Sequence, residues 1–537
     1  MKDYIKRQKI LIVLGVSLFI LIGSGLTYAA LTWATSNPIN IGLTSGCFEI
    51  NYTPGGAINN ANVEVMNEST LISNNKFTIT EGIALTYANI GIKSTCTIEG
   101  YGSLYLNVTN LSNAFTTGSS KGSLKYAILN NTTSSTTLTV AGLKGQSFDI
   151  VKTGTITSTG TVNILTKQLS NTSQNKYLIV FYIDGSKIGN DVVGASFAGN
   201  ISADAHQGKA PYEGLAKLIA NDTFNSTKTV TLNSVNYKYD DTHKLMEDVA
   251  GNIRYYGSNP NNYIYFNCSD YNNQSSSTCE TWKIIGVFDG KVKIMRGSII
   301  GTYSWDNKNE DTGAETAYGK NDWTTARLMK LLNPNNYYTI DSNDNGYGQS
   351  LYWDAQSGIC FSGQDNAITS CDFTSTGLKN DITRNMIAET TYYTRGHNNN
   401  SIFVDAMYDK ERVSGTVVNA TPPRTLTWTG KVAIPYPSDY GYAADLSLCQ
   451  KQLGSYNDVT CTANNWMKSI LASNYGWLLT PESGYENAAW RVSSSGSVYY
   501  SGIAYLAYGV LPVLSLISEL DIGSGSGTSS SPYQLSV

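Results

Sequence analysis

The chain has 537 residues, 15% of which are charged, and a formal net charge of −4 at pH 7. This length is too great for one hydrophobic core and predicts two or three folded units, while the slightly acidic balance excludes the basic surface that nucleic-acid binding requires. The 49 glycines and 37 tyrosines favour extracellular β-structure, because tyrosine suits half-buried strands and glycine suits turns.

Residues 1–31 predict a signal or signal-anchor helix. Basic residues precede an uncharged run from Ile10 to Ile22, and the apolar character continues to Leu31. This charge order places the N-terminus in the cytoplasm and the rest of the chain outside. Thr27-Tyr28-Ala29 is an acceptable cleavage site, yet residues 10–31 are also long enough to span a bilayer. Cleavage and membrane anchoring both stay open, and either one predicts a cell-surface or extracellular protein.

The eight cysteines indicate an oxidising compartment. In sequence order they form the pairs Cys47/Cys96, Cys268/Cys279, Cys360/Cys371 and Cys449/Cys461. Each of the last three pairs brackets a short polar loop, and a disulfide closing such a loop contributes about 3 kcal/mol by removing entropy from the unfolded chain. Zinc is the alternative, but no pair has the close spacing that zinc sites use. Disulfides in sequence order are therefore predicted.

Residues 37–205 are predicted to form an all-β domain. Segments with alternating or β-branched residues, such as Lys76–Thr80 and Ser103–Val108, are expected as strands. Many short strands without helical periodicity indicate a sandwich. The dipeptide Asp184-Gly185 follows an apolar run and predicts a two-residue type I′ hairpin, because both residue types tolerate positive φ.

Several motifs in this region match one group of proteins. The N-terminal segment ends in Thr-Tyr-Ala, Thr-Ser-Gly-Cys-Phe-Glu-Ile-Asn-Tyr follows, and Gly-Asn-Ile-Ser-Ala closes the region at residues 199–203. This arrangement resembles exported Gram-positive proteins that a dedicated signal peptidase handles, the camelysin and biofilm-fibre proteins among them. The resemblance implies a jelly-roll-like or immunoglobulin-like sandwich outside the membrane, and its relatives include fibre formers.

Residues 206–250 are predicted to be a connector that leads into a second domain at residues 251–537. Short helices are expected in that domain from Trp323 to Leu332 with Asp322 as cap, after Asp381, and from Asn465 to Ala472. A few helices among antiparallel strands indicate an α+β arrangement.

The best-specified hairpin of the second domain has its turn at Asp289-Gly290. A two-residue turn places Val287 opposite Val292. It also places Ile285 opposite Ile294, which would give one continuous apolar face.

A series of motifs runs through residues 251–537. In order they are IRYYGSNPNNYIYFN, TWKIIGVFDGKVKIMR, NDWTTARLMKLLN, SDYGYA, WLLTP and the closing GVLPVLSL with GSGSGTSSSPYQL. The domain is similar to a large uncharacterised family of Gram-positive surface domains, and the resemblance covers nearly all of this range. It implies a C-type lectin-like fold. Relatives usually carry Arg where this chain has Leu511.

Few residues suggest chemistry. Residues 341–346 match the first half of a calcium loop, with Asp341, Asn343 and Asn345 as oxygen ligands, but Tyr352 stands where a bidentate Glu belongs. An Asn-rich polar loop without metal is the alternative. The three histidines are far apart in sequence, and no Ser-His-Asp or Cys-His pattern is present. The sequence therefore predicts neither catalysis nor a cofactor, apart from calcium at this one loop.

Two functions stay open. The first is a non-catalytic binding or adhesion module on the surface of a Gram-positive bacterium, whose second domain contacts a glycan or a surface protein. The second is a structural component of an extracellular matrix or fibre. Tyr499, Tyr500, Tyr505 and Tyr508 could form an aromatic binding surface or pack the core, and their position in predicted strands favours packing.

Overall fold

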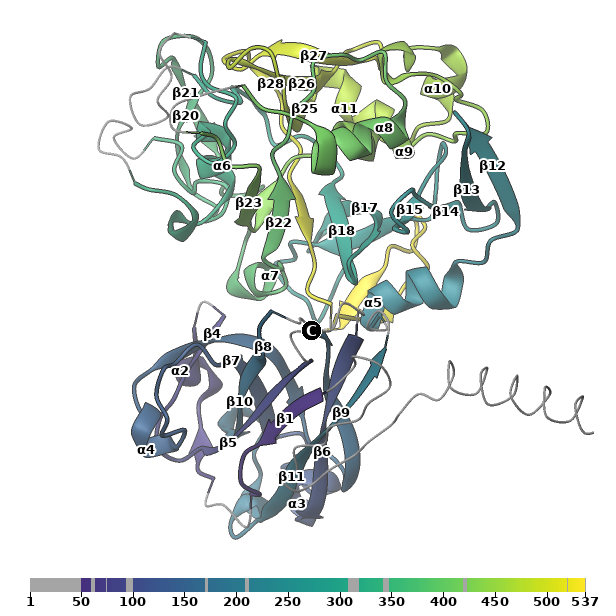
Figure 1. Cartoon of the computed structure of the whole chain (residues 1–537). Helices are drawn as coiled ribbons and strands as arrows, with labels where there is room; N and C mark the ends of the chain where they lie inside the picture. Colours follow the sequence, from purple (N-terminus) through teal and green to yellow (C-terminus); the bar gives the residue numbers. More distant parts are fainter. Residues whose placement is uncertain are drawn as a thin grey trace, which may run out of the picture. The chain divides into compact units, whose positions relative to one another are not determined.

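The computed structural model describes residues 50–58, 63–73, 75–92, 100–169, 172–207, 212–307, 318–340, 347–418, 423–518 and 520–536. The chain divides into two compact units, one ending at Pro211 and one beginning at Tyr212 (Figure 1). The predicted helix at residues 1–31 lies outside the described residues, and so do Cys47 and Cys96. Among the helices of the described ranges, none is long and apolar enough to cross a membrane.

Two sheets build the first unit. The larger has the strand order β1-β5-β10-β7-β8-β4-β3, with β2 beside β10, and the smaller has the order β11-β6-β9. The strands are β1 Ile50–Pro54, β2 Val65–Met66, β3 Ile72–Ser73, β4 Lys76–Thr78, β5 Ala84–Ile92, β6 Gly100–Leu111, β7 Leu124–Asn130, β8 Ser147–Thr155, β9 Gly160–Leu169, β10 Asn175–Asp184 and β11 Phe197–Gln207. The short helices are α2 Glu68–Leu71, α3 Asn113–Thr116 and α4 Val140–Leu143.

Strand β10 shows how the first unit is packed. Ile179 and Phe181 belong to a core shared with residues of the smaller sheet. The alternate residues Leu178 and Val180 belong to a second core on the opposite face of the larger sheet. The uninterrupted apolar sequence of β10 therefore follows from burial on both faces.

The prediction of a hairpin at Asp184-Gly185 is wrong. Strand β10 pairs with β5 and β7, and Gly185–Lys187 form a 3₁₀ turn, η1. Asp184 Oδ1 accepts hydrogen bonds from the Ser186 amide at 3.0 Å and the Ser186 hydroxyl at 2.8 Å, and Asp184 Oδ2 lies 2.9 Å from Lys125 Nζ. The buried, ion-paired carboxylate thus caps a turn that leads away from β10.

A nine-stranded sheet is the centre of the second unit, in the order β12-β13-β14-β15-β17-β18-β29-β24 with β16 beside β17. Its strands are β12 Lys228–Leu232, β13 Val235–Asp240, β14 Leu245–Glu247, β15 Ile253–Tyr255, β16 Tyr263–Phe266, β17 Glu280–Phe288, β18 Lys291–Arg296, β24 Val432–Ala433 and β29 Val513–Ser515. Smaller sheets contain β19 Thr302–Tyr303, β20 Ser357–Phe361, β21 Ile368–Asp372, β22 Thr390–Tyr393, β23 Thr427–Gly430, β25 Trp477–Pro481, β26 Ala488–Val492, β27 Val498–Ile503, β28 Tyr508–Gly509, β30 Asp521–Ser524 and β31 Gln534–Ser536.

Short helices cover both faces of this sheet (Figure 1). Helices α8, α9 and α11 contribute to the core on one face, and α5 and α6 contribute to the core on the other. The helices are α5 Gly214–Lys217, α6 Arg327–Leu332, α7 Asp381–Asn385, α8 Val404–Asp409, α9 Pro437–Tyr442, α10 Val459–Ala463 and α11 Lys468–Leu471. The second unit thus combines antiparallel strands with short helices, as the α+β prediction requires.

The prediction of a connector at residues 206–250 is wrong, because these residues belong to the two units. Residues 206–207 complete β11, and β12, β13 and β14 extend the large sheet of the second unit. The cross-strand pair Val230 and Tyr237 is buried in its core. Pattern alone did not show this, because residues that pack over these strands, such as Tyr442 against Tyr237, come from far later in the chain.

The hairpin of β17 and β18 is confirmed at its turn. Asp289 and Gly290 have φ angles of 48° and 75°, as a type I′ turn requires. Val287 pairs with Val292 as predicted.

Farther from the turn the predicted register is wrong. Ile294 pairs with Ile284, because a β-bulge lies between Ile284 and Gly286. The bulge turns Ile285 to the opposite face, where it joins the core beneath α8, α9 and α11. Both faces of β17 are therefore apolar and buried.

The helices are shorter than predicted. Helix α6 begins only at Arg327, while Asp322 accepts a hydrogen bond from the Thr324 amide in a preceding turn. Asn380 caps α7 instead of Asp381.

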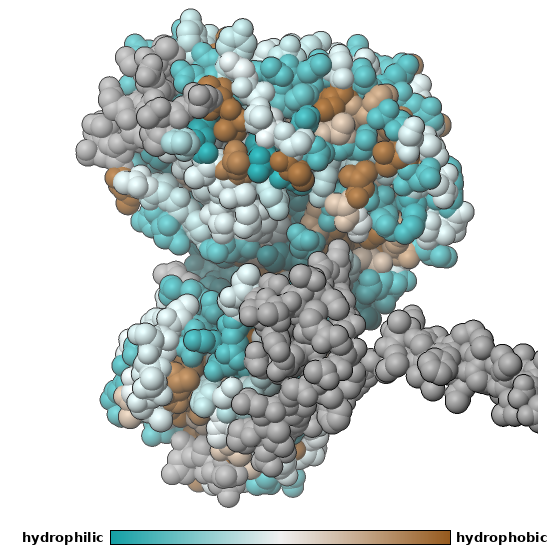
Figure 2. Space-filling model, viewed as in Figure 1, coloured by the Kyte–Doolittle hydropathy of each residue, from teal (hydrophilic) through white to brown (hydrophobic). Residues whose placement is uncertain are grey.

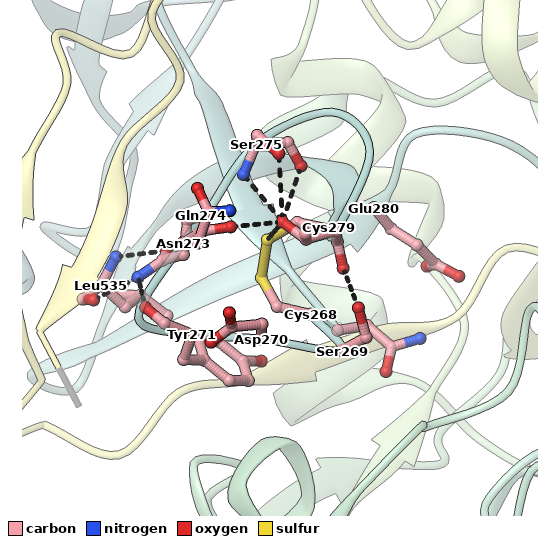
Figure 3. The surroundings of a disulfide bond; sticks show 12 residues. Cys268, Ser269, Asp270, Tyr271, Asn273, Gln274, Ser275, Cys279, Glu280 and Leu535 are labelled. Atoms are coloured by element: carbon pink, nitrogen blue, oxygen red, sulfur yellow. Dashed lines mark hydrogen bonds between the residues drawn. A yellow bond between two sulfur atoms is a disulfide. The ribbon is translucent and has the colours of Figure 1, made fainter.

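Three of the predicted disulfides are present: Cys268–Cys279, Cys360–Cys371 and Cys449–Cys461. Figure 3 shows the first of them, which closes the loop between β16 and β17. Gln274 in this loop donates to the Leu535 carbonyl at 2.6 Å and accepts from the Leu535 amide at 3.0 Å. The loop is therefore fixed both at its base and to the C-terminal strand β31.

Candidate functional site

Two buried cations lie in one row across the large sheet. The strand register aligns Arg254 of β15, Gly286 of β17 and Lys293 of β18. A Cβ atom at Gly286 would lie 2.2 Å from the Ile253 carbonyl oxygen, so the tight approach of β15 and β17 requires glycine.

Asp439, in the first turn of α9, contacts both cations. Its Oδ1 lies 3.0 Å from Arg254 Nη1, and its Oδ2 lies 2.5 Å from Lys293 Nζ. Asp248 Oδ2 lies 2.6 Å from Arg254 Nε. These four side chains, which we call the buried ion cluster, are at most 7% exposed. The cluster ties the sheet to α9 and is buried from solvent.

The charges of the cluster shift one another's pKa values. Burial by itself would raise the pKa of Asp439, but Lys293, Arg254 and Arg412 together lower it below its ordinary value. Burial lowers the pKa of Lys293 to about 8, against the attraction of Asp439. The cluster is a structural element that depends on Asp439 remaining ionised.

A pocket of about 580 Å³ opens on the second unit beside β16, β17 and β18. Its lining includes Tyr263, Glu280, Lys283, Arg296, Trp466 and Ser469, and we call it the Lys283 pocket. Exposed polar residues, among them Ser258, Asn259, Ser298 and Ser469, lie around buried Trp466 and Lys283. The pocket therefore combines aromatic rings, hydroxyl and amide groups, and charges.

Lys283 is buried in this pocket without a carboxylate. Its Nζ donates to Asn262 Oδ1 at 2.9 Å and lies 3.1 Å from the centre of the Tyr263 ring. The Trp466 ring centre is 5.7 Å away. In the part of the chain that the structure describes, no acidic group forms an ion pair with Lys283. Burial lowers the pKa of the Lys283 ammonium to about 7, so the charged and neutral amines coexist at neutral pH.

The other two charges of the pocket compensate each other. Arg296 Nε lies 2.9 Å and Nη2 lies 3.3 Å from the two carboxylate oxygens of Glu280. Trp282 Nε1 also donates to Glu280 Oε2 at 3.1 Å, and Arg296 Nη1 donates to the Ser298 carbonyl at 3.0 Å. Within the described part of the chain, Lys283 is therefore the pocket charge that lacks a counterion.

A second group of aromatic residues surrounds Arg491 of β26. The guanidinium carbon is 5.3 Å from the ring centres of Tyr475, Tyr499 and Tyr508. Tyr475 is 42% exposed. Its backbone φ is 52°, a left-handed conformation that is unfavourable for a bulky residue. Gly502 accommodates the side chain, since a Cβ there would lie 3.0 Å from Arg491 Cδ.

The four tyrosines singled out in the sequence have mixed environments. Tyr499 and Tyr508 contact Arg491 at the surface, Tyr500 packs against Trp490, and Tyr505 packs against Tyr318. Core packing therefore explains only part of this set of tyrosines.

On the face shown in Figure 2, apolar side chains of the second unit are separated by hydrophilic ones.

The predicted calcium ligands Asp341, Asn343 and Asn345 lie outside the described residues. Within the described ranges, no group of three or more His, Cys, Asp or Glu side chains could hold a metal ion. His206 and His243 each pair with a neighbouring aspartate, and His397 stacks on Trp490. The structure does not bring the histidines together into one site.

Sequence reasoning missed the Lys283 pocket. One signal was present: Lys283 interrupts an apolar strand between Trp282 and Ile284. Nothing local shows that Asn262 and Trp466 would contact Lys283, since Trp466 lies far along the chain.

Comparison with protein-family models gave no match, and comparison with curated proteins gave none either.

Proposed function

We propose that the protein is a non-catalytic binding module of a Gram-positive cell surface and that its second unit holds a glycan in the Lys283 pocket. The observation that carries the proposal is the combination of aromatic and polar groups in that pocket. The motif resemblance, with its implied sandwich and C-type lectin-like fold, supports the surface location. The disulfides agree with an oxidising environment.

The pocket has the chemistry that a sugar ring needs. Its volume of about 580 Å³ falls in the range of about 300–1,000 Å³ typical of small-ligand sites. The apolar face of a sugar packs against aromatic rings such as Tyr263, while its hydroxyls exchange hydrogen bonds with groups such as Asn259 and Ser469. The Glu280–Arg296 pair adds a charged acceptor and donor at fixed positions.

The wall of the pocket is held in place before any ligand arrives. Tyr263 and Lys283 are cross-strand neighbours on β16 and β17. The Cys268–Cys279 disulfide closes the loop between these strands, and Glu280 directly follows the bridge (Figure 3). A site that is already ordered loses little entropy on binding.

A steric block tests the proposal. Ser469 is an exposed pocket residue of α11, so Ser469→Trp should fill the pocket and weaken retention on purified Gram-positive cell-wall polysaccharide at least tenfold. Ser473→Trp, at an exposed position outside the pocket lining, is the matched control and should bind like the wild type. Mass spectrometry of the eluted glycan should show no cleavage. Equal retention of the two variants, or no retention of the wild type, would overturn the proposal.

A further inference from the structure

We infer that the Lys283 pocket selects glycans that carry a negatively charged group, a carboxylate or a phosphate, and that Lys283 gains a proton as such a ligand binds. The inference rests on the proposed function, because it names the ligand class of the same pocket.

The first step is the charge of the empty pocket. Besides Lys283, the titratable or charged groups that line the pocket are Tyr263 from β16, Glu280 from β17 and Arg296 from β18. Of these, the Tyr263 ring lies against Lys283 Nζ. The segment that contributes Trp466, Ser469 and Ile470 adds no charge to the lining. Glu280 and Arg296 neutralise each other through two contacts. A protonated Lys283 therefore gives the pocket a net positive charge.

The second step is the bonding capacity of the amine. A lysine ammonium has three N–H donors, and Asn262 Oδ1 accepts one of them. The Tyr263 ring lies against the nitrogen and stabilises a cation through its π-face without accepting a conventional hydrogen bond. Among the residues that the structure describes, the ammonium thus has unused donors and no counterion, which is the arrangement that an anionic ligand group completes.

The third step is the energetic cost of the empty state. Keeping an unpaired ammonium buried is unfavourable, and in the empty pocket this cost lowers the pKa of Lys283 to about 7. A ligand anion beside Nζ removes the cost and favours the charged form. A neutral sugar offers no such compensation, so the preference for an anionic glycan follows from the same missing counterion.

The coupling predicts a pH dependence. With a pKa of about 7, about nine-tenths of empty pockets hold a charged lysine at pH 6 and about 3% do so at pH 8.5, so the apparent affinity for an anionic ligand falls about 30-fold between these values. At pH 8.5 each bound ligand should take up close to one proton from the buffer.

Calorimetry on the full chain tests the inference with glucuronic acid and glycerol 3-phosphate as charged probes and with glucose and glycerol as their uncharged counterparts. We expect one or both charged probes to bind more tightly than the counterpart at pH 6 and to weaken at pH 8.5. The loss is about 30-fold for glucuronic acid and smaller for glycerol 3-phosphate, because its second ionisation at about pH 6 adds negative charge over this range. Binding enthalpies measured in buffers of different ionisation enthalpy should show proton uptake. The two probes distinguish a carboxylate from a phosphate source. Lys283→Met should abolish both the charge preference and the pH dependence while leaving the melting temperature at or above that of the wild type.

The outcomes separate this inference from the proposed function. Binding of the neutral sugar as tightly as glucuronic acid, with Ser469→Trp still blocking it, would overturn the charge selection and leave the glycan site intact. A charge preference that survives in Lys283→Met would also overturn it, because another group would then hold the anion. No binding of any probe, together with no retention on cell-wall polysaccharide, would overturn both.

Discussion

Removing the charge of Asp439 should destabilise the second unit more than any exposed charge change. Its carboxylate is 0% exposed and contacts Lys293 Nζ at 2.5 Å and Arg254 Nη1 at 3.0 Å. It also accepts from the Tyr436 amide at 3.0 Å. The amide of Asp439→Asn is nearly isosteric, but it leaves Lys293 without its anion and Arg254 with Asp248 alone. Removing one partner of a buried ion pair costs about 3–5 kcal/mol, which is the expected loss.

Guanidinium unfolding followed by tryptophan fluorescence measures this loss. All tryptophans except Trp33 lie at residue 282 or beyond, so the signal reports the second unit. The control is Asp222→Asn, which removes an exposed ion pair with Lys217 and should cost less than about 1 kcal/mol.

The effect of pH gives a second check on Asp439. The pKa of this carboxylate is below its ordinary value in the folded state, so its contribution is present above the unfolded pKa of about 3.9 and is lost as pH falls. The difference between wild type and Asp439→Asn should therefore shrink in acid. A loss for Asp439→Asn no larger than that for Asp222→Asn at pH 7 would refute the reasoning.

Three further outcomes are expected. Gly286→Ala should lower the unfolding free energy by about 3 kcal/mol because its Cβ would meet the β15 backbone, whereas Gly523→Ala, with no atom nearer than 3.8 Å, should change it by less than about 0.5 kcal/mol. The folded pKa of Lys283 lies near 7, below the unfolded value of about 10.4. The unfolding free energy of the wild type should therefore rise with pH between these values relative to that of Lys283→Met. Parallel stability–pH curves for the two proteins would contradict this. A fragment of residues 212–537 should unfold cooperatively in a denaturant titration, while residues 251–537, which lack β12 to β14, should be less stable or aggregate.

Two identical dipeptides show where sequence reasoning holds and where it does not. Asp289-Gly290 forms the predicted hairpin turn, because the strands on both sides are long enough to pair with each other. Asp184-Gly185 does not, because Lys125 from β7 and the Ser186 amide bind the aspartate and redirect the chain. The turn propensity is the same in both places, and the tertiary partners of the aspartate decide the outcome.

The sequence by itself determined the features whose partners are close in the chain. These include the three short disulfide loops, the turn at Asp289-Gly290 and the many strands of both units. Only the tertiary structure decided that β12 to β14 belong to the second unit, that a bulge shifts Ile285 to the other face, and that Lys283 meets Asn262 and Trp466. The physical reason is that burial, and with it the charge state of Lys283, depends on residues brought together from distant segments, and a local pattern carries no record of them.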